Sequence, residues 1–247
     1  MRMNRMHTML KGISLAVIWL TCCMGFAQST TVSQLQTLST WVQPGSTGNM
    51  GGGSPTTPNG VFQMTPGNPA TFSMAASIPY AGAYWYYNIP GAWNSATYFE
   101  DQMRITFPSL ADFNASQAIE FELQQNVGST IYNMAFQFDF AGSHLVRTFD
   151  YNKSVWVPTN IPTSTFNPTG TNVIAVLFLR DAPSNTVTSL GMSINGVWYP
   201  VNATRKGTPR VESDYVHCAF QLDSNYARTP YSVNVDNMGV TMMSTSQ

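Results

Sequence analysis

Glu120, Glu122 and Gln124 are the side chains of this sequence best placed to do chemistry together. They alternate with apolar residues over 119–124, and neighbouring side chains of a strand point to opposite faces, so all three are expected on one face. Carboxylate and amide groups in such a row can take paired hydrogen bonds from the hydroxyl groups of a sugar. The pattern predicts a polar strand face that could hold a glycan.

Two later strand-like runs carry the same alternation and extend this polar face. In 132–140 and 216–223, aromatic and aliphatic residues alternate with amides, acids and a histidine. A run over 102–107 offers an arginine, and the aromatic run 83–88 offers a ring on which a sugar could stack. The predicted glycan-binding residues are Glu120, Glu122, Gln124, Gln137, Asp139, His217, Gln221, Asp223, Arg104 and Trp85.

Strands must position these side chains, and the composition agrees with an all-β fold. Charged residues make up 9% of the chain and aromatic residues 13%, which is typical of strands joined by turns rather than of exposed helices. The alternation predicts an antiparallel sheet with one apolar and one polar face. A second set of runs, at 173–179, 190–194 and 233–243, would supply an opposing sheet. Together they predict an antiparallel two-sheet jelly-roll sandwich.

The first 27 residues are expected to be a signal peptide. Arg2, Arg5 and Lys11 precede an apolar run that ends in small residues, which is the pattern that signal peptidase reads. The run is shorter than the roughly 20 residues that span a membrane. We therefore expect an exported protein, secreted or periplasmic, with a lipid anchor on Cys23 as the alternative.

The rest of the chain is expected to divide into an N-terminal segment, 28–60, and a β-sandwich domain, 61–247. The segment has a modest apolar periodicity around Leu35 that predicts a helical turn, followed by a Gly/Ser/Pro-rich stretch over 44–60. We interpret this stretch as a loop or linker. We expect part of the segment to fold back onto the domain as a strand.

Charge and cysteine content exclude several classes of protein. Cleavage of the signal peptide would leave eight basic residues against twelve acidic ones, which gives no basic footprint for nucleic acid or an anionic membrane. Cys218 would then be the one cysteine, so no internal disulfide is expected, and its place in the alternation predicts a buried thiol. His144 and His217 are too few for a multi-histidine metal site.

The run Val233–Met242 resembles the last strand of concanavalin A-like, laminin G-like and carbohydrate-binding sandwich modules, because an acid and an amide, Asp236 and Asn237, interrupt its apolar alternation. The block from 118 to 223 resembles a family of secreted bacterial proteins without an established activity. The likeness covers residues 70–243 and implies a concanavalin A-like fold, which lectins, glycanases and lyases share. In such sandwiches an acid like Asp236 can ligate structural calcium, which takes six to eight oxygens. We predict no cofactor, with that calcium as the alternative.

The resemblance extends to laminarinase-type glucanases, which carry a nucleophile Glu, a helper Asp and an acid/base Glu along one strand. Glu120 matches the nucleophile and Glu122 replaces the helper, but Gln124 stands where the acid/base is needed. An amide cannot give and recover a proton, and retaining hydrolysis needs two carboxyl groups about 5 to 5.5 Å apart. No catalytic residue is therefore predicted, and whether the protein is an enzyme stays open.

A polysaccharide lyase would need groups that neutralise a uronate carboxylate and a Tyr or His that takes a proton. Arg104, Gln124, Gln137, His217 and Gln221 are suitable types, but the motifs of alginate-lyase jelly rolls are absent. Our first interpretation is a secreted lectin-like domain that binds a polysaccharide or glycan through its polar sheet face. The alternatives are a carbohydrate-active enzyme, either a divergent glycoside hydrolase or a lyase, and a non-catalytic structural protein of the envelope or matrix.

Overall fold

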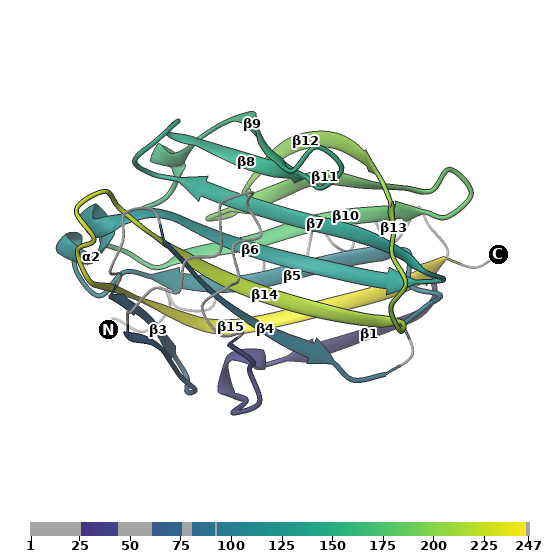
Figure 1. Cartoon of the computed structure of the whole chain (residues 1–247), viewed down its shortest axis with the longest axis horizontal. Coiled ribbons are helices and arrows are strands. Elements are labelled where there is room, and N and C mark those ends of the chain that lie inside the picture. The colour runs from purple at the N-terminus through teal and green to yellow at the C-terminus, as the bar shows by residue number, and fades with distance from the viewer. Residues whose placement is uncertain (1–25, 44–60, 76–80, 92, 246–247) are drawn as a thin grey trace, which may run out of the picture.

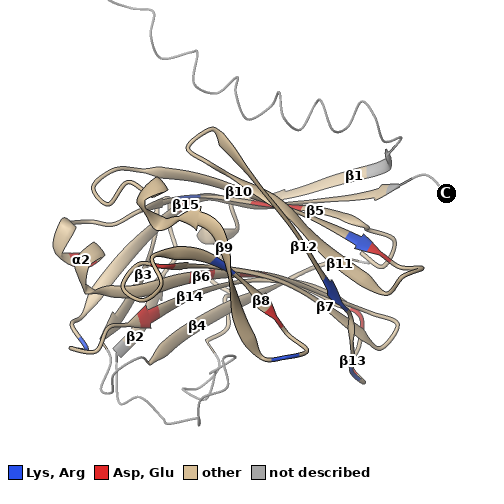
Figure 2. Cartoon of the chain, turned by 90° about the horizontal axis from the view of Figure 1, so that it is seen from above, with Lys and Arg blue, Asp and Glu red and all other residues tan. Residues whose placement is uncertain are grey.

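The computed structural model describes residues 26–43, 61–75, 81–91 and 93–245, which form two antiparallel β-sheets packed face to face (Figure 1). The view from above separates the two layers and shows how sparse the charged residues are (Figure 2). The predicted two-sheet jelly-roll sandwich is confirmed. Most of the predicted signal peptide and the whole Gly/Ser/Pro-rich stretch lie outside the described residues.

One sheet, which we call the polar sheet after its outer face, has the strand order β4-β14-β6-β7-β8-β9, and β13 pairs with β7. Its strands are β4 (Gly82–Ile89), β6 (Ser116–Val127), β7 (Thr130–Asp139), β8 (Leu145–Asp150), β9 (Val155–Pro162), β13 (Thr208–Pro209) and β14 (Tyr215–Ser224). β6 lies between β14 and β7, so its side chains have neighbours on both sides.

The other sheet, which we call the opposing sheet, has the order β12-β11-β10-β5-β15-β3-β2, and β1 also pairs with β15. Its strands are β1 (Phe26–Ser33), β2 (Val61–Thr65), β3 (Ala70–Ala75), β5 (Tyr98–Thr106), β10 (Asn172–Asp181), β11 (Thr186–Ile194), β12 (Val197–Lys206) and β15 (Tyr231–Thr245). β1 confirms that part of the N-terminal segment folds back as a strand.

Helical structure in the described residues is limited to α2 (Leu110–Ala115) and two 3-10 turns, η1 (Leu35–Thr37) and η2 (Thr163–Thr165). η1 falls where the periodicity around Leu35 predicted a helical turn. The Ser109 hydroxyl caps α2 by accepting a hydrogen bond of 3.1 Å from the Asp112 backbone N–H. No described helix has the length and apolar character needed to span a membrane.

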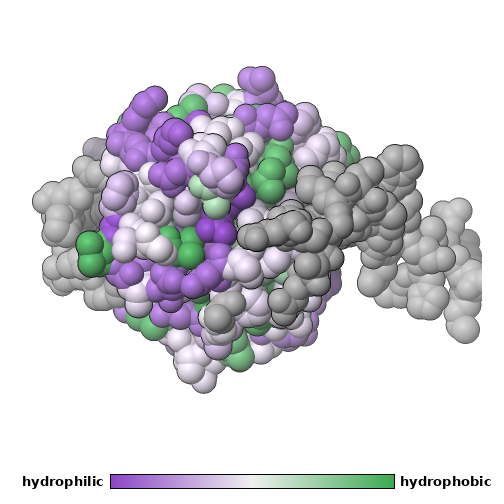
Figure 3. Space-filling model, turned by 90° about the vertical axis from the view of Figure 1, so that its right-hand side faces the viewer, coloured by the Kyte–Doolittle hydropathy of each residue, from purple (hydrophilic) through white to green (hydrophobic). Residues whose placement is uncertain are grey.

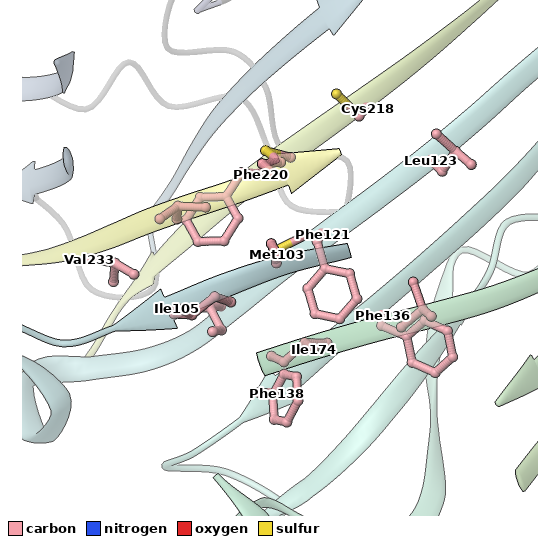
Figure 4. Close-up of a cluster of buried hydrophobic side chains, with 14 of the residues drawn as sticks. Met103, Ile105, Phe121, Leu123, Phe136, Phe138, Ile174, Cys218, Phe220 and Val233 are labelled. Atoms are coloured by element: carbon pink, nitrogen blue, oxygen red, sulfur yellow. The ribbon is translucent and has the colours of Figure 1, made fainter. Parts of the chain in front are cut away.

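Aromatic side chains from the two sheets meet in the core. The ring of Phe72 on β3 lies 4.8 Å from that of Phe220 on β14, and the ring of Phe136 on β7 lies 5.7 Å from that of Phe178 on β10. Burial of such a side chain contributes about 1.5–3 kcal/mol, so these contacts hold the sheets together. Figure 4 shows Cys218 in the same layer as Phe220, which confirms the predicted buried thiol.

At one end of the sandwich, the described residues show only small apolar patches. Figure 3 shows the end that lies on the right in Figure 1, where the described hydrophobic residues form small separate patches among hydrophilic ones.

Candidate functional site

The register of β14, β6 and β7 places side chains in rows across the outer face of the polar sheet. Alternate residues of these strands, such as Phe121 and Leu123, point into the core, and the residues between them point outward. Three successive rows are Gln221, Glu120 and Gln137; Ala219, Glu122 and Ala135; and His217, Gln124 and Asn133. One row further on, Asp223 and Asp139 flank Ala118. Eight of the ten predicted residues therefore share one face.

The structure corrects the prediction for Arg104, which does not lie on this face. Arg104 belongs to β5, a strand of the opposing sheet, and its Nε lies 3.2 Å from Asp236 Oδ1 on β15. The alternation over 102–107 was correct, but it could not reveal which sheet the strand joins. Asp236, the predicted alternative calcium ligand, is thus paired with a cation of the chain itself. Within the described part of the chain, no three His, Cys, Asp or Glu residues cluster in a way that could hold a metal ion.

Trp85 is a second correction, because it points to the wrong side of its sheet. Its side chain is 1% exposed and its ring lies 5.2 Å from that of Phe72 in the core. Its neighbours Tyr84 and Tyr86 point outward instead, since adjacent strand residues alternate between faces. The aromatic run does contribute rings to the polar face, but through its tyrosines.

Glu120 and Asp223 form a carboxyl pair on this face. Gln137 Nε2 donates hydrogen bonds to Glu120 Oε1 and, at 3.3 Å, to Asp223 Oδ2, while Gln221 Nε2 donates to Asp223 Oδ1 at 2.8 Å. Burial raises the pKa of Glu120 well above its usual value, and the neighbouring Asp223 carboxylate raises it further. Burial also raises the pKa of Asp223, although hydrogen bonds from Glu120, Gln221 and Gln137 oppose that rise. Glu120 is therefore the member that holds the proton.

Asp139 has a structural role at the end of β7. Its carboxylate accepts hydrogen bonds from the backbone N–H groups of Gly142 (3.0 Å) and Ser143 (2.6 Å) and from Gln117 Nε2 (2.9 Å). Arg147 Nη2 lies 3.3 Å from it. Burial alone would raise the pKa of Asp139, but the Ser143 hydrogen bonds, the Arg147 charge and the Gly142 N–H outweigh it and lower that pKa. This carboxylate is fully occupied within the chain.

Glu122 occupies the centre of the face between two alanines, Ala135 and Ala219. Its Oε1 accepts a hydrogen bond of 2.5 Å from Asn133 Nδ2 and lies 3.6 Å from His217 Nε2. No described residue hydrogen-bonds to its Oε2. Because an alanine side chain ends at Cβ, the neighbouring strands extend nothing over this carboxylate within its row.

Aromatic rings lie beside this carboxylate on the β4 and β14 side. The Tyr84 hydroxyl lies 3.4 Å from His217 Nε2, and the rings of Tyr86 and Tyr215 lie 5.6 and 5.4 Å from the His217 ring. Burial raises the pKa of Tyr84 well above its usual value, and the charge of Glu122 adds to this effect. Tyr84 therefore stays a neutral hydrogen-bonding group.

The centre of the face is buried and its polar groups are bonded to one another. Gln124 and Gln137 are 2% and 3% exposed and Glu122 is 7% exposed, while Glu120 and Asp223 at one end are half-buried. A sheet surface that merely faces water leaves its charged side chains solvated. This network is instead ordered by internal hydrogen bonds, as expected where a polar face has a fixed geometry.

The sequence prediction missed several members of the face. Arg147 on β8 donates from Nε to Gln137 Oε1 at 2.6 Å, and the Tyr215 hydroxyl accepts from Gln124 Nε2 and donates to Glu212. Asn133 was in the alternation but was not selected. Alternation along 83–88 was the signal that could have identified Tyr84, because Tyr84 must point outward if Trp85 points inward.

No protein family matches the sequence, and no curated protein matches it. Solved structures match it over most of its length. The CBM2 module of the evolved Dit of Lactobacillus casei BL23 phage J-1 has a TM-score of 0.51 at 12% identity and covers 89% of this chain and 98% of that one. The alginate lyase Aly36B has a TM-score of 0.49 at 13% identity, and the match covers 87% of this chain and 97% of the lyase chain. Lectin I from Ulex europaeus, solved with the methyl glycoside of α-L-fucose, has a TM-score of 0.46 at 14% identity. The match covers 87% of this chain and 98% of the lectin chain.

At 12% identity, the similarity to the CBM2 module shows the fold and nothing finer. This fold is a jelly-roll β-sandwich of the concanavalin A-like type. Because one fold can host many functions, the function of this chain depends on the side chains of its own polar face.

Proposed function

We propose that this protein is a lectin-like domain that binds a polysaccharide or glycan on the outer face of the polar sheet. The observation that carries the proposal is the Glu122 row, in which a carboxylate lies between two alanines and has one oxygen to which no described residue hydrogen-bonds. Sugar hydroxyls donate to carboxylate oxygens, and sugar C–H surfaces stack on aromatic rings such as those of Tyr84 and Tyr86. This face supplies both kinds of group next to each other.

The ordering of the face also supports a binding role. The side chains around Glu122 are held by Asn133, by His217 and by hydrogen bonds within the rows, so little side-chain entropy remains to be lost when a ligand binds. A face already fixed in this way is expected to bind with modest reorganisation.

Replacing one of these alanines with a bulky residue tests the proposal. Ala135→Phe places a ring beside Glu122 without removing any polar group, and Ala175→Phe is the matched control. The two alanines are 6% and 7% exposed, and they lie on the outer faces of the polar and opposing sheets respectively. In affinity electrophoresis against a panel of polysaccharides, Ala135→Phe should abolish retardation, whereas Ala175→Phe should retain it. Retardation of neither or both variants, with wild-type circular dichroism, would place binding elsewhere.

A glycoside hydrolase is the second candidate, because Glu120 retains a proton that a general acid could give to a leaving group. Burial and the Asp223 charge hold that proton on Glu120, and Gln124 offers no second acid. We therefore expect no new reducing ends when the protein is incubated with the polysaccharide that it retains. Release of reducing ends that is lost in Glu120→Gln would instead establish hydrolysis.

We also propose that the protein is exported, since the positive and apolar N-terminal residues have the pattern of a signal peptide. Fractionation of cells that express the full chain would test this, and retention in the cytoplasm at the full length would contradict it.

A further inference from the structure

Three buried amide oxygens on the polar face have no hydrogen-bond partner among the described residues: Asn126 Oδ1, Asn133 Oδ1 and Gln221 Oε1. Their orientation is fixed, because each amide nitrogen already donates, to Ser213 O, to Glu122 and to Asp223 respectively. A carboxylate or carbonyl oxygen can only accept, so none of these amides can turn over without losing its bond. The unfilled positions are therefore acceptors, and a ligand that fills them has to donate.

The charges on this face also favour a ligand that donates hydrogen bonds. In the part of the chain that the structure describes, Glu122 and Asp223 lack an arginine or lysine partner within 4 Å, while Arg147 is already shared between Asp139 and Gln137. A sugar that carries a carboxylate or a sulfate would meet acceptors, acidic groups and an occupied arginine. An anionic glycan is accordingly a poor match.

Aromatic rings complete the surroundings of the central carboxylate. Tyr86, His217 and Tyr215 form a line of neighbouring rings, and the Tyr84 ring lies 6.1 Å from that of Tyr86. A cation is attracted to the faces of such rings as well as to a carboxylate. A carboxylate with an oxygen that no described residue occupies, together with buried acceptors and aromatic rings, is the combination that recognises an ammonium group.

We propose, on the basis of the glycan-binding function above, that the face selects amino sugars whose amine is free. The ammonium group would lie at Glu122 Oε2, with further hydrogen bonds accepted by Asn133 Oδ1. The ring hydroxyls of the same sugar would extend toward Gln221 Oε1. Acetylation of the amine removes both its charge and two of its three N–H donors, and would remove the preference.

The test compares two oligosaccharides of equal length, a β-1,4-linked glucosamine oligomer and its fully N-acetylated counterpart, by isothermal titration calorimetry at a pH where the amine is protonated. We expect the wild type to bind the free-amine oligomer about tenfold more tightly. Glu122→Gln, which keeps the shape and an acceptor for Asn133, should bind both about equally. Asp181→Asn removes the same charge from the end of β10 in the opposing sheet and should keep the preference.

Each outcome separates this inference from the proposed function. Equal wild-type affinity for both oligomers would overturn the amine preference and leave glycan binding standing. Tightest binding to an oligouronate would overturn it as well and would favour a lyase. If no glycan binds at all, the proposed function fails too. The comparison within the wild type does not depend on the folding of any variant.

Discussion

Glu120 and Asp223 belong to different strands, β6 and β14, but share one hydrogen-bond donor, because Gln137 Nε2 donates to Glu120 Oε1 and, at 3.3 Å, to Asp223 Oδ2. Two buried carboxylates that are both ionised repel each other, so such a pair favours keeping one proton. Burial and the Asp223 charge keep that proton on Glu120, while Gln137 and Gln221 donate to Asp223. One acid of this face is therefore held in its protonated form.

The proton on Glu120 makes stability depend on pH. Its pKa is raised in the folded state, so its stabilising contribution is complete below the ordinary pKa of Glu and is lost as the pH rises through the folded value. In Glu120→Gln this position carries a neutral amide at every pH. We expect the variant to lose less stability than the wild type between acid and mildly alkaline pH, by about 1.4 kcal/mol for each tenfold difference in proton affinity between the folded and unfolded states. Urea denaturation at a series of pH values checks this, and parallel curves for the two proteins would contradict it.

The contribution of Asp139 to stability should depend on pH in the opposite direction to that of Glu120. Its pKa is lowered in the folded state, so its contribution is present above the ordinary pKa of Asp and is lost as the pH falls through the folded value. Asp139→Asn replaces one of the two acceptor oxygens with an NH2 group and removes the charge that faces Arg147, so it is expected to reduce the free energy of unfolding by about 2–4 kcal/mol at neutral pH. The difference from the wild type should shrink in acid, as measured by denaturation at neutral and acid pH. Asp181→Asn, an exposed acid, serves as the control.

Asp101 is predicted to be a destabilising residue. It lies on β5 with 1% of its surface exposed, between Val176 and Val240 in register, and neither carboxyl oxygen has a partner among the described residues. Burial, with the charge of Glu100, raises its pKa well above the usual value. Asp101→Val should raise the free energy of unfolding at neutral pH by about 1–3 kcal/mol.

Chemical denaturation of Asp101→Val and Asp101→Asn separates charge from polarity. The valine variant should have a higher free energy of unfolding than the wild type at all pH values. The asparagine variant should exceed the wild type mainly at high pH, where Asp101 would otherwise ionise. A loss of stability in the valine variant would show that the carboxyl has a partner or a task in the folded protein.

Local alternation predicted which side of a strand each residue occupies, because that property depends on neighbouring residues alone. It placed Glu120, Glu122 and Gln124 correctly on one face and Cys218 in the core. It could not predict which sheet a strand joins, since that depends on pairings between distant segments. Arg104 was therefore assigned to the wrong sheet despite a correct alternation.

The partners of the polar face depend on register across strands, which the sequence does not display. Arg147 reaches Gln137 only because β8 pairs with β7, and Tyr84 reaches His217 only because β4 pairs with β14. Trp85 shows the sensitivity to a single step along the chain, because choosing it instead of Tyr84 moves the ring from the outer face to the core.

The buried thiol of Cys218 can report how often the two sheets separate. The thiol is fully enclosed, and burial raises its pKa well above the ordinary value, so it is both shielded and protonated in the closed sandwich. An alkylating reagent can react with it only when the two sheets part. The rate of labelling at Cys218 therefore reports how often the sandwich opens, at the layer where the sheets meet.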